Sequence, residues 1–189
     1  MVINMSIRLY VGSVACDTPR ADAEKYGYGL CGFEFNDDFS KAKGLVVRGQ
    51  VLNPAYLWEK DDVLYSGCEF TDSAYFAAHR MNREDGHLEF INSVEVDGAG
   101  LCMINGSGNT VLGSEFWSGN LLSCSLAEDG SLAKLESYIH HEGHSVVLPR
   151  QECSHVHSVY PSPDGKYAVA CDLGMHRIPV GSIFNLAMC

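Results

Sequence analysis

Short runs of apolar residues alternate with polar ones along the chain and are separated by turns. Residues 89–94 and 133–139 each follow an Asp-Gly dipeptide, a strong signal for a tight turn between antiparallel strands. No stretch has apolar residues at the three- and four-residue spacing of a long helix. The 19 glycines and nine tyrosines also favour turns and strands. The pattern predicts an all-β chain.

Two sets of segments repeat. Glu-Asp-Gly-His-Leu at residues 84–88 returns as Glu-Asp-Gly-Ser-Leu at residues 128–132, a shift of 44 residues. Three longer segments align without gaps, at residues 62–70, 108–116 and 165–173. Each is a turn residue, an apolar strand, and an acid followed by an apolar residue. The shifts between them are 46 and 57 residues, and an extra loop at residues 140–151 explains the longer one.

A period in the forties with several short strands per repeat is typical of β-propeller blades. Helical repeats can share this period, but they need amphipathic helices, and the segments show strand alternation instead. We therefore expect one architectural unit, a partial propeller of about three and a half blades, four-stranded where complete. The fourth blade is expected to stop after two strands. The expected blades are about 7–50, 51–95, 96–140 and an incomplete 150–178, followed by a divergent tail at 179–189.

Several segments resemble the lactonase family of seven-bladed propellers, which includes bacterial 6-phosphogluconolactonase and the fungal carboxymuconate-lactonizing enzyme. The most specific is Arg-Gln-Glu-Cys-Ser-His-Val-His-Ser at residues 150–158, followed by Ser-Pro-Asp-Gly at 162–165 and Asp-Leu-Gly-Met-His-Arg at 172–177. They match the family's R-Q-x-x-x-H-x-H-S, S-P-D-G and D-L-G-x-D-R motifs in order and spacing. Residues 9–13, 52–57 and 64–69 are similar to the opening strand and second blade of the family.

The chain departs from the family pattern at several places. Met103 stands where the family usually has a histidine, Glu115 and Phe116 replace an asparagine-tyrosine pair, and His176 replaces an aspartate. The resemblance ends after Arg177. Family chains run to roughly twice this length, which implies a truncated or frame-shifted product or an isolated half.

The net charge of −11 argues against a nucleic-acid partner, because phosphate contacts need a basic face. One or two arginines can still hold a phosphate on an acidic protein. No segment is apolar for long enough to span a membrane, and no signal peptide is recognisable. The eight cysteines include no C-x-x-C pair, so we expect reduced thiols and a cytoplasmic location. No cofactor or metal is implied.

The arrangement of a propeller blade suggests where a site lies. The start of the first strand and the end of the second meet on one face of the disc, which places His155 and His157 near Asp172. The same rule sets Glu69 and Glu115 at equivalent points of neighbouring blades. Residues two apart on a strand point the same way. We therefore expect a partial ring of acids and imidazoles around the mouth of the channel.

Lactone hydrolysis needs a base to activate water and a positive group for the developing oxyanion. His155 or His157 is the candidate base, and Arg177 and Arg150 are the candidate anion-binding groups. The substrate-binding candidates are Arg150, Gln151, Asp172, Glu69 and Glu115. Alternatively, both histidines pin the blade, Asp172 caps a turn, and the two glutamates bond loop amides.

A histidine-rich segment at residues 140–144, His-His-Glu-Gly-His, does not have the spacing of a metal site on a helix, so we expect a solvated loop.

The resemblance implies hydrolysis of a phosphorylated sugar lactone, 6-phosphogluconolactone, in the pentose phosphate route, by an incomplete and poorly active chain. Two alternatives stay open. One is a non-enzymatic propeller remnant that binds a protein or ligand, and the other is muconate-lactonizing chemistry on the same fold. Half a ring also leaves two open flanks, which predicts self-association.

Overall fold

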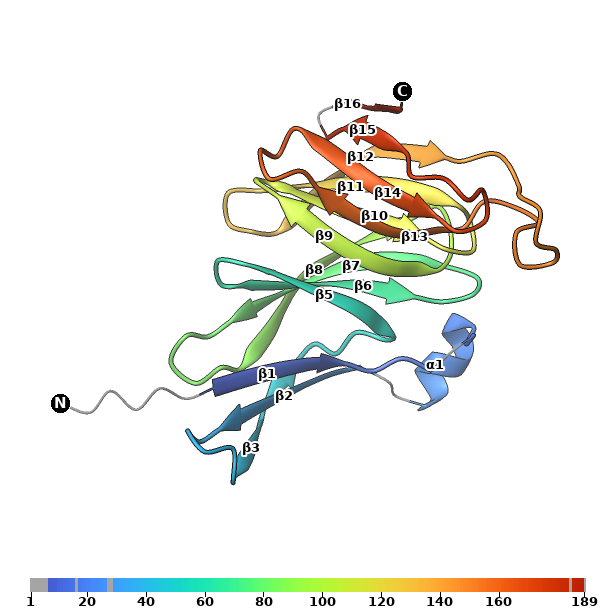
Figure 1. Cartoon of the computed structure of the whole chain (residues 1–189). Coiled ribbons are helices and arrows are strands. Elements are labelled where there is room, and N and C mark those ends of the chain that lie inside the picture. The colour runs from blue at the N-terminus through green and yellow to red at the C-terminus, as the bar shows by residue number, and fades with distance from the viewer. Residues whose placement is uncertain (1–6, 16, 27–28, 184, 189) are drawn as a thin grey trace.

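The computed structural model describes residues 7–15, 17–26, 29–183 and 185–188. Four β-sheets stack side by side in chain order, from the first at the blue end to the fourth at the red end (Figure 1). One short helix, α1 (Arg20–Tyr26), lies between the first two strands. The first sheet contains β1 (Ile7–Gly12), β2 (Leu30–Phe35) and β3 (Ala42–Leu45).

The other three sheets each contain four consecutive antiparallel strands. The second has β5 (Pro54–Lys60), β6 (Val63–Glu69), β7 (Ala74–Met81) and β8 (Leu88–Val96). The third has β9 (Leu101–Ser107), β10 (Thr110–Glu115), β11 (Asn120–Leu126) and β12 (Leu132–His140). The fourth has β13 (Val156–Pro161), β14 (Tyr167–Asp172), β15 (Val180–Ser182) and β16 (Asn185–Met188).

The first strand of each sheet lies next to the first strand of the neighbouring sheet, so that β1, β5, β9 and β13 follow one another around a common axis. The remaining strands of each sheet succeed one another outward from that axis. This is the arrangement of propeller blades, and the predicted all-β propeller is confirmed.

The repeated Asp-Gly turns occupy equivalent places. Gly86 and Gly130 have φ of 73° and 82°, values that a residue with a side chain rarely adopts. The strands that follow begin at Leu88 and Leu132, the last residues of the two repeated pentapeptides. The repeat therefore marks the turn between the third and fourth strands of a blade.

The core lies between the sheets. Leu30 and Val51 pack against Leu64 and Phe70 at the junction of the first and second sheets. The second and third sheets share a larger cluster, which includes Tyr65, Phe76, Leu101, Ile104 and Val111. The third and fourth sheets meet through Leu112, Leu121, Val156, Val159, Ala168 and Ala170. Burial of each leucine, isoleucine, valine or phenylalanine side chain among them contributes about 1.5–3 kcal/mol.

Two expectations about the sheets are corrected. The first sheet has three strands instead of four, because the next segment, β4 (Val47–Arg48), pairs in parallel with β8 on the edge of the second sheet. The fourth sheet does not stop after two strands. The tail forms β15 and β16, which pair with β14 and with each other. These strands are three and four residues long, too short for the alternation to be recognised in the sequence.

Within the described residues no helix is long and apolar enough to cross a membrane. The six described cysteines, Cys31, Cys68, Cys102, Cys124, Cys153 and Cys171, are free thiols.

Candidate functional site

Three predicted site residues gather around the ring of Phe116, the residue after β10. The His155 imidazole stacks on this ring with centroids 4.4 Å apart, and its Nδ1 lies 2.9 Å from the Phe116 carbonyl oxygen. His157 meets the ring edge-on at 5.5 Å, and the guanidinium of Arg150 lies over it at 5.2 Å. Both histidines therefore contact one aromatic ring. The His157 side chain is exposed, whereas the His155 side chain is buried.

Asp172 lies beside the histidines, as predicted, because Val156 is its partner across β13 and β14. Its carboxylate accepts hydrogen bonds from His141 Nδ1 (3.0 Å), Ser154 Oγ (2.8 Å) and the backbone N–H groups of His155 and Met175 (3.0 Å each). Burial by itself raises the pKa of Asp172. The hydrogen bonds outweigh it and hold the pKa well below its usual range.

Gln151 is buried and both ends of its amide are occupied. Its Nε2 donates to the Leu173 carbonyl at 2.8 Å, and its Oε1 accepts from the Val147 N–H at 3.1 Å. It therefore fastens the loop before β13 to the turn after β14. Its contact with substrate stays a prediction. In the structure its side chain connects two loops.

Arg177 is exposed and follows the turn that begins at Asp172, with which it forms an isolated β-bridge. It lines a cavity of about 460 Å³ together with His157 and Asp172. Ser158 and Cys171 form the wall of this cavity on the fourth sheet. The cavity thus brings one candidate base and one candidate oxyanion-binding group together.

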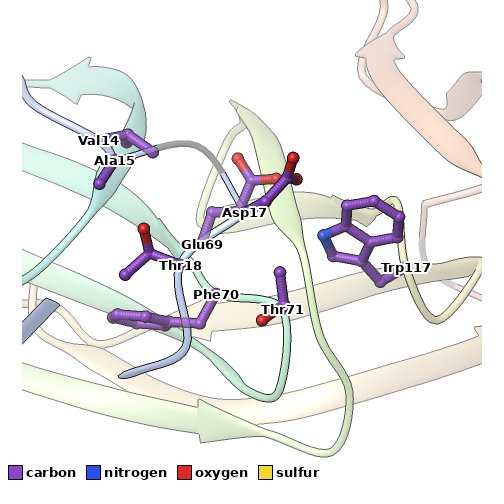
Figure 2. A pocket seen from close by; sticks show the side chains of 8 residues that line it. All are labelled: Val14, Ala15, Asp17, Thr18, Glu69, Phe70, Thr71 and Trp117. Atoms are coloured by element: carbon purple, nitrogen blue, oxygen red, sulfur yellow. The ribbon is translucent and has the colours of Figure 1, made fainter. Parts of the chain in front are cut away.

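Glu69, at the end of β6, lies in a smaller cavity of about 90 Å³ (Figure 2). Its carboxylate lies close to that of Asp17 in Figure 2, and Trp117 forms the opposite wall. Burial raises the pKa of Glu69, and the negative charge of Asp17 raises it further. The charge of His157 has the opposite effect and lowers the pKa of Glu69. Glu69 is therefore close enough to His157 for their charges to interact.

Glu115, at the end of β10, is fully buried. Its Oε2 accepts a hydrogen bond from Asn120 Nδ2, and its Oε1 has no partner in the described part of the chain. Asn120 also donates to Tyr138 Oη at 2.6 Å, and its Oδ1 lies 2.9 Å from His140 Nδ1. Burial raises the pKa of Glu115 to about 7.

The expected equivalence of Glu69 and Glu115 is wrong. Glu69 pairs with Ala74, whose side chain belongs to the cluster shared with the following sheet. Glu115 pairs with Asn120 and lies against Gly98 in the connection from the preceding sheet. Asp172 also points back toward its preceding sheet, through His141 and Ser154. The strands align in sequence, but β6 is offset by one residue, which turns its side chains to the other face.

The expected ring of acids around the channel mouth is therefore only partly present. Asp172 and Glu115 are enclosed between sheets, whereas Glu69 reaches a cavity. The structure gathers Glu69, His157, Arg150 and Phe116 in one region and separates Glu115 from it.

Sequence analysis missed several residues of this region. Phe116 was noted as a departure from a family motif, yet it is the ring on which the histidines and Arg150 meet. Trp117 and Asp17 carried no repeat signal. The expected solvated loop is wrong for His141, which is buried with its Nδ1 on Asp172. Among the residues described, no group of three or more His, Cys, Asp or Glu side chains is arranged to hold a metal ion.

Comparison with known proteins places this geometry in a family. The family described as "Lactonase, 7-bladed beta-propeller" matches residues 8–184. A 6-phosphogluconolactonase of Bacillus subtilis is 27% identical over 154 residues, which are 79% of this chain and 44% of that protein. An uncharacterized protein of Staphylococcus epidermidis is 28% identical over 159 residues, 82% of this chain and 46% of its own.

Solved structures of other propellers have a fold similar to that of this chain. A Bacteroides fragilis protein studied as a candidate 6-phosphogluconolactonase superposes with a TM-score of 0.81 at 27% identity, over 96% of this chain and 49% of that one. The periplasmic gluconolactonase of Pseudomonas aeruginosa has a similar fold, with a TM-score of 0.78 at 24% identity, over 94% and 50% of the two chains. The chain spans about half the length of the curated relatives it matches. From the propeller of sheets and the matched residues we conclude that this chain belongs to the lactonase family of seven-bladed β-propellers.

Proposed function

We propose that this chain hydrolyses the lactone ring of a phosphorylated sugar, 6-phosphogluconolactone, to the open acid. The observation that supports this most is the position of His157 in a lactonase-family chain. Its imidazole is exposed, stands edge-on to Phe116 and lines the same cavity as Arg177. The Bacillus subtilis relative, which is named for this activity, supports the choice of substrate.

In the proposed reaction His157 takes a proton from water while the water oxygen attacks the lactone carbonyl carbon. The carbonyl electron pair moves to oxygen, and the Arg177 guanidinium donates hydrogen bonds to the oxyanion. The ring C–O bond then breaks, and the imidazolium gives its proton to the departing ring oxygen. The products are a free hydroxyl group and the carboxylic acid, which releases its proton to solvent and becomes the carboxylate.

Two further side chains have supporting roles in this proposal. As a carboxylate, Glu69 stabilises the imidazolium that His157 becomes during the reaction, because opposite charges attract each other. Arg150 binds the substrate phosphate, since its guanidinium is exposed and held over the Phe116 ring. We assign His155, Gln151 and Asp172 to holding these groups in place, because all three are buried with partners of their own. Glu115 lies apart from the site and has no role in the proposed reaction.

The test is the rate of acid release from 6-phosphogluconolactone by the purified chain, above spontaneous hydrolysis. His157→Ala should lower kcat at least about 100-fold, the usual loss when a general base is removed. His144→Ala is the matched control, because His144 is an exposed histidine of the loop before β13. Its rate should equal that of the parent chain. An unchanged rate in His157→Ala contradicts the assignment.

The substrate can be tested separately. Arg150→Ala should raise KM for the phosphorylated lactone and leave KM for unphosphorylated gluconolactone unchanged. We expect slow turnover relative to the Bacillus subtilis relative, because this chain spans 44% of that protein's length. Turnover of carboxymuconate alone would favour the lactonizing alternative. A folded chain without either activity would favour a non-enzymatic binding role.

A further inference from the structure

An exposed cysteine and a buried histidine face each other just before β13. The Cys153 Sγ lies 3.7 Å from His155 Nε2, within hydrogen-bond reach for sulfur. The other ring nitrogen, Nδ1, lies 2.9 Å from the Phe116 carbonyl oxygen, which can only accept a hydrogen bond. Nδ1 therefore carries a proton, and in the neutral ring Nε2 has the free lone pair. The thiol is the donor of the hydrogen bond between Cys153 and His155, and the imidazole is the acceptor.

The imidazole is held in this orientation by its surroundings. The ring of Phe116 stacks on it, with centroids 4.4 Å apart and planes inclined by 11°. The His155 backbone N–H donates to Asp172 Oδ1 at 3.0 Å. Gly174, in the turn after β14, has no room for a Cβ, which would collide with the Cys153 carbonyl oxygen. The fold therefore fixes both the ring and the backbone that carries the thiol and its base.

The other described cysteines lack this arrangement. Cys68 and Cys124 are buried and Cys102 is half-buried. Burial raises the pKa of the Cys68 and Cys102 thiols to about 12 and that of Cys124 to about 11. Cys31 and Cys171 are exposed, yet within the described chain neither thiol has an imidazole at hydrogen-bond distance. Among the cysteines that the structure describes, one combines access from solvent with a neighbouring base.

We propose that Cys153 is a site of thiol–disulfide exchange, with His155 as its base and a small organic disulfide as its substrate. The nucleophile in this reaction is the thiolate, and a cysteine without an adjacent base is only a few per cent thiolate at neutral pH. Transfer of the thiol proton to His155 Nε2 supplies the thiolate, as in other cysteine–histidine pairs. The exposure of Cys153 gives the disulfide access to it.

In the proposed step the Cys153 thiolate attacks one sulfur of the disulfide and forms a new S–S bond. The old S–S bond breaks, its electron pair leaves on the second sulfur, and the imidazolium gives its proton to this departing thiolate. Cys153 is oxidised to a mixed disulfide, and the departing half of the substrate is reduced to a thiol. Excess thiol reverses the step. Neither His157 nor Arg177 takes part, so this chemistry is independent of the proposed lactone hydrolysis.

The test is the rate at which each cysteine of the folded chain forms a mixed disulfide with hydroxyethyl disulfide at pH 7. Acid quenching and peptide mass mapping give the rate of each site separately. Cys153 should react about 10-fold faster than Cys31 and Cys171, because a cysteine without an adjacent base is only a few per cent thiolate at this pH. Dithiothreitol should remove the adduct. Equal rates at the three exposed cysteines would overturn the proposal.

A substitution of the base tests the role of the imidazole. In His155→Asn the amide can still donate to the Phe116 carbonyl, but no nitrogen accepts the thiol proton. Cys153 should therefore react about 10-fold more slowly, at the rate of the other exposed cysteines. His144→Ala is the matched control, because His144 is an exposed histidine of the same loop, and Cys153 should keep the parent rate there. A parent rate in His155→Asn would contradict the role of His155.

Circular dichroism must show that His155→Asn keeps its strands. If the variant unfolds, the parent chain in urea provides the comparison, since unfolding removes the stacking and the backbone contacts that hold the imidazole against the thiol. The advantage of Cys153 over Cys31 and Cys171 should then disappear. An advantage that persists in urea would show that the folded pair does not cause it, and the proposal would be wrong.

Discussion

Asp172 and Glu69 are both acids at the end of the second strand of a blade, and their surroundings are opposite. Asp172 is 2% exposed and accepts four hydrogen bonds, from His141, Ser154, His155 and Met175. Glu69 is half-buried, reaches a cavity shared with Asp17 and Trp117, and interacts with His157 through charge.

The difference arises from the direction in which each side chain leaves its strand. Asp172 points back to the connection from the preceding sheet, where donors from residues 141–155 surround it. Glu69 points forward, because β6 is offset by one residue relative to β10 and β14. An acid at the same place in the sequence repeat thus holds two blades together in one case and faces an opening in the other.

The largest expected effect is that of Asp172→Ala. Removal of the carboxylate leaves four donors without an acceptor, three of them buried, and we expect a loss of roughly 3–5 kcal/mol in the free energy of unfolding. Urea unfolding measures it. Asp164→Ala is the control, because Asp164 lies in an exposed turn and accepts only local hydrogen bonds. It should change stability by less than about 1 kcal/mol.

The effect of Asp172 also depends on pH. Its folded pKa lies below the unfolded value of 3.8, so its stabilisation is fully present above that value and is lost as the pH falls through the folded pKa. The difference between the parent chain and Asp172→Ala should therefore shrink below about pH 4. A constant difference down to pH 2 would contradict the role of the charged form.

Glu115→Gln should have the next largest effect, with the opposite sign. The folded pKa of Glu115 is about 7, above its ordinary value of 4.5. The folded chain therefore holds the proton more tightly than the unfolded chain, and the free energy of unfolding falls as the pH rises from 4.5 to 7. Glutamine does not ionise, so the free energy of unfolding of the variant does not fall in this way. The variant should be more stable than the parent chain at pH 8 by roughly 3 kcal/mol. Thermal unfolding at pH 5 and pH 8 tests this, and equal variant-to-parent differences at the two values would contradict it.

Glu69→Gln should have the smallest effect on stability, below about 0.5 kcal/mol, because the side chain is partly exposed. Its effect should appear in catalysis if the proposed function holds. Without the negative charge the imidazolium that His157 becomes during the reaction has lost a stabilising neighbour, so kcat should fall while KM stays the same. An unchanged kcat would contradict the interaction between these two groups.

Much of the fold could be predicted from the sequence. The Asp-Gly turns at Gly86 and Gly130 fix the start of β8 and β12, and the hydrophobic runs of the second strands are long enough to recognise. The pairing of β4 with β8 and the strands β15 and β16 could not be predicted. These strands are two to four residues long. Where they pair depends on the free edge of the neighbouring strand and not on an alternation of apolar and polar residues in their own sequence.

Less of the site could be predicted. The closeness of His155 to Asp172 follows from the path of the chain through a blade, and it was expected. The side of the sheet to which the Glu69 side chain points could not be predicted. A strand that is offset by one residue keeps the same sequence alignment, but its side chains point to the opposite face of the sheet. The role of His141 was missed for a different reason. It lies in an irregular loop two residues before Gly143, and only the folded connection brings it to Asp172, 31 positions later.

The two-residue strand β4 joins the first two sheets beyond their side-chain contacts. It leaves the first sheet and pairs with the outer edge of β8, where the Leu88 N–H donates to the Val46 carbonyl at 2.9 Å. The next turn is fastened as well, since the buried His79 ring lies 2.7 Å from the Gly49 carbonyl through Nε2. The first blade therefore cannot separate from its neighbour without opening the edge of that neighbour. We expect the two to exchange their amide hydrogens as a single cooperative unit.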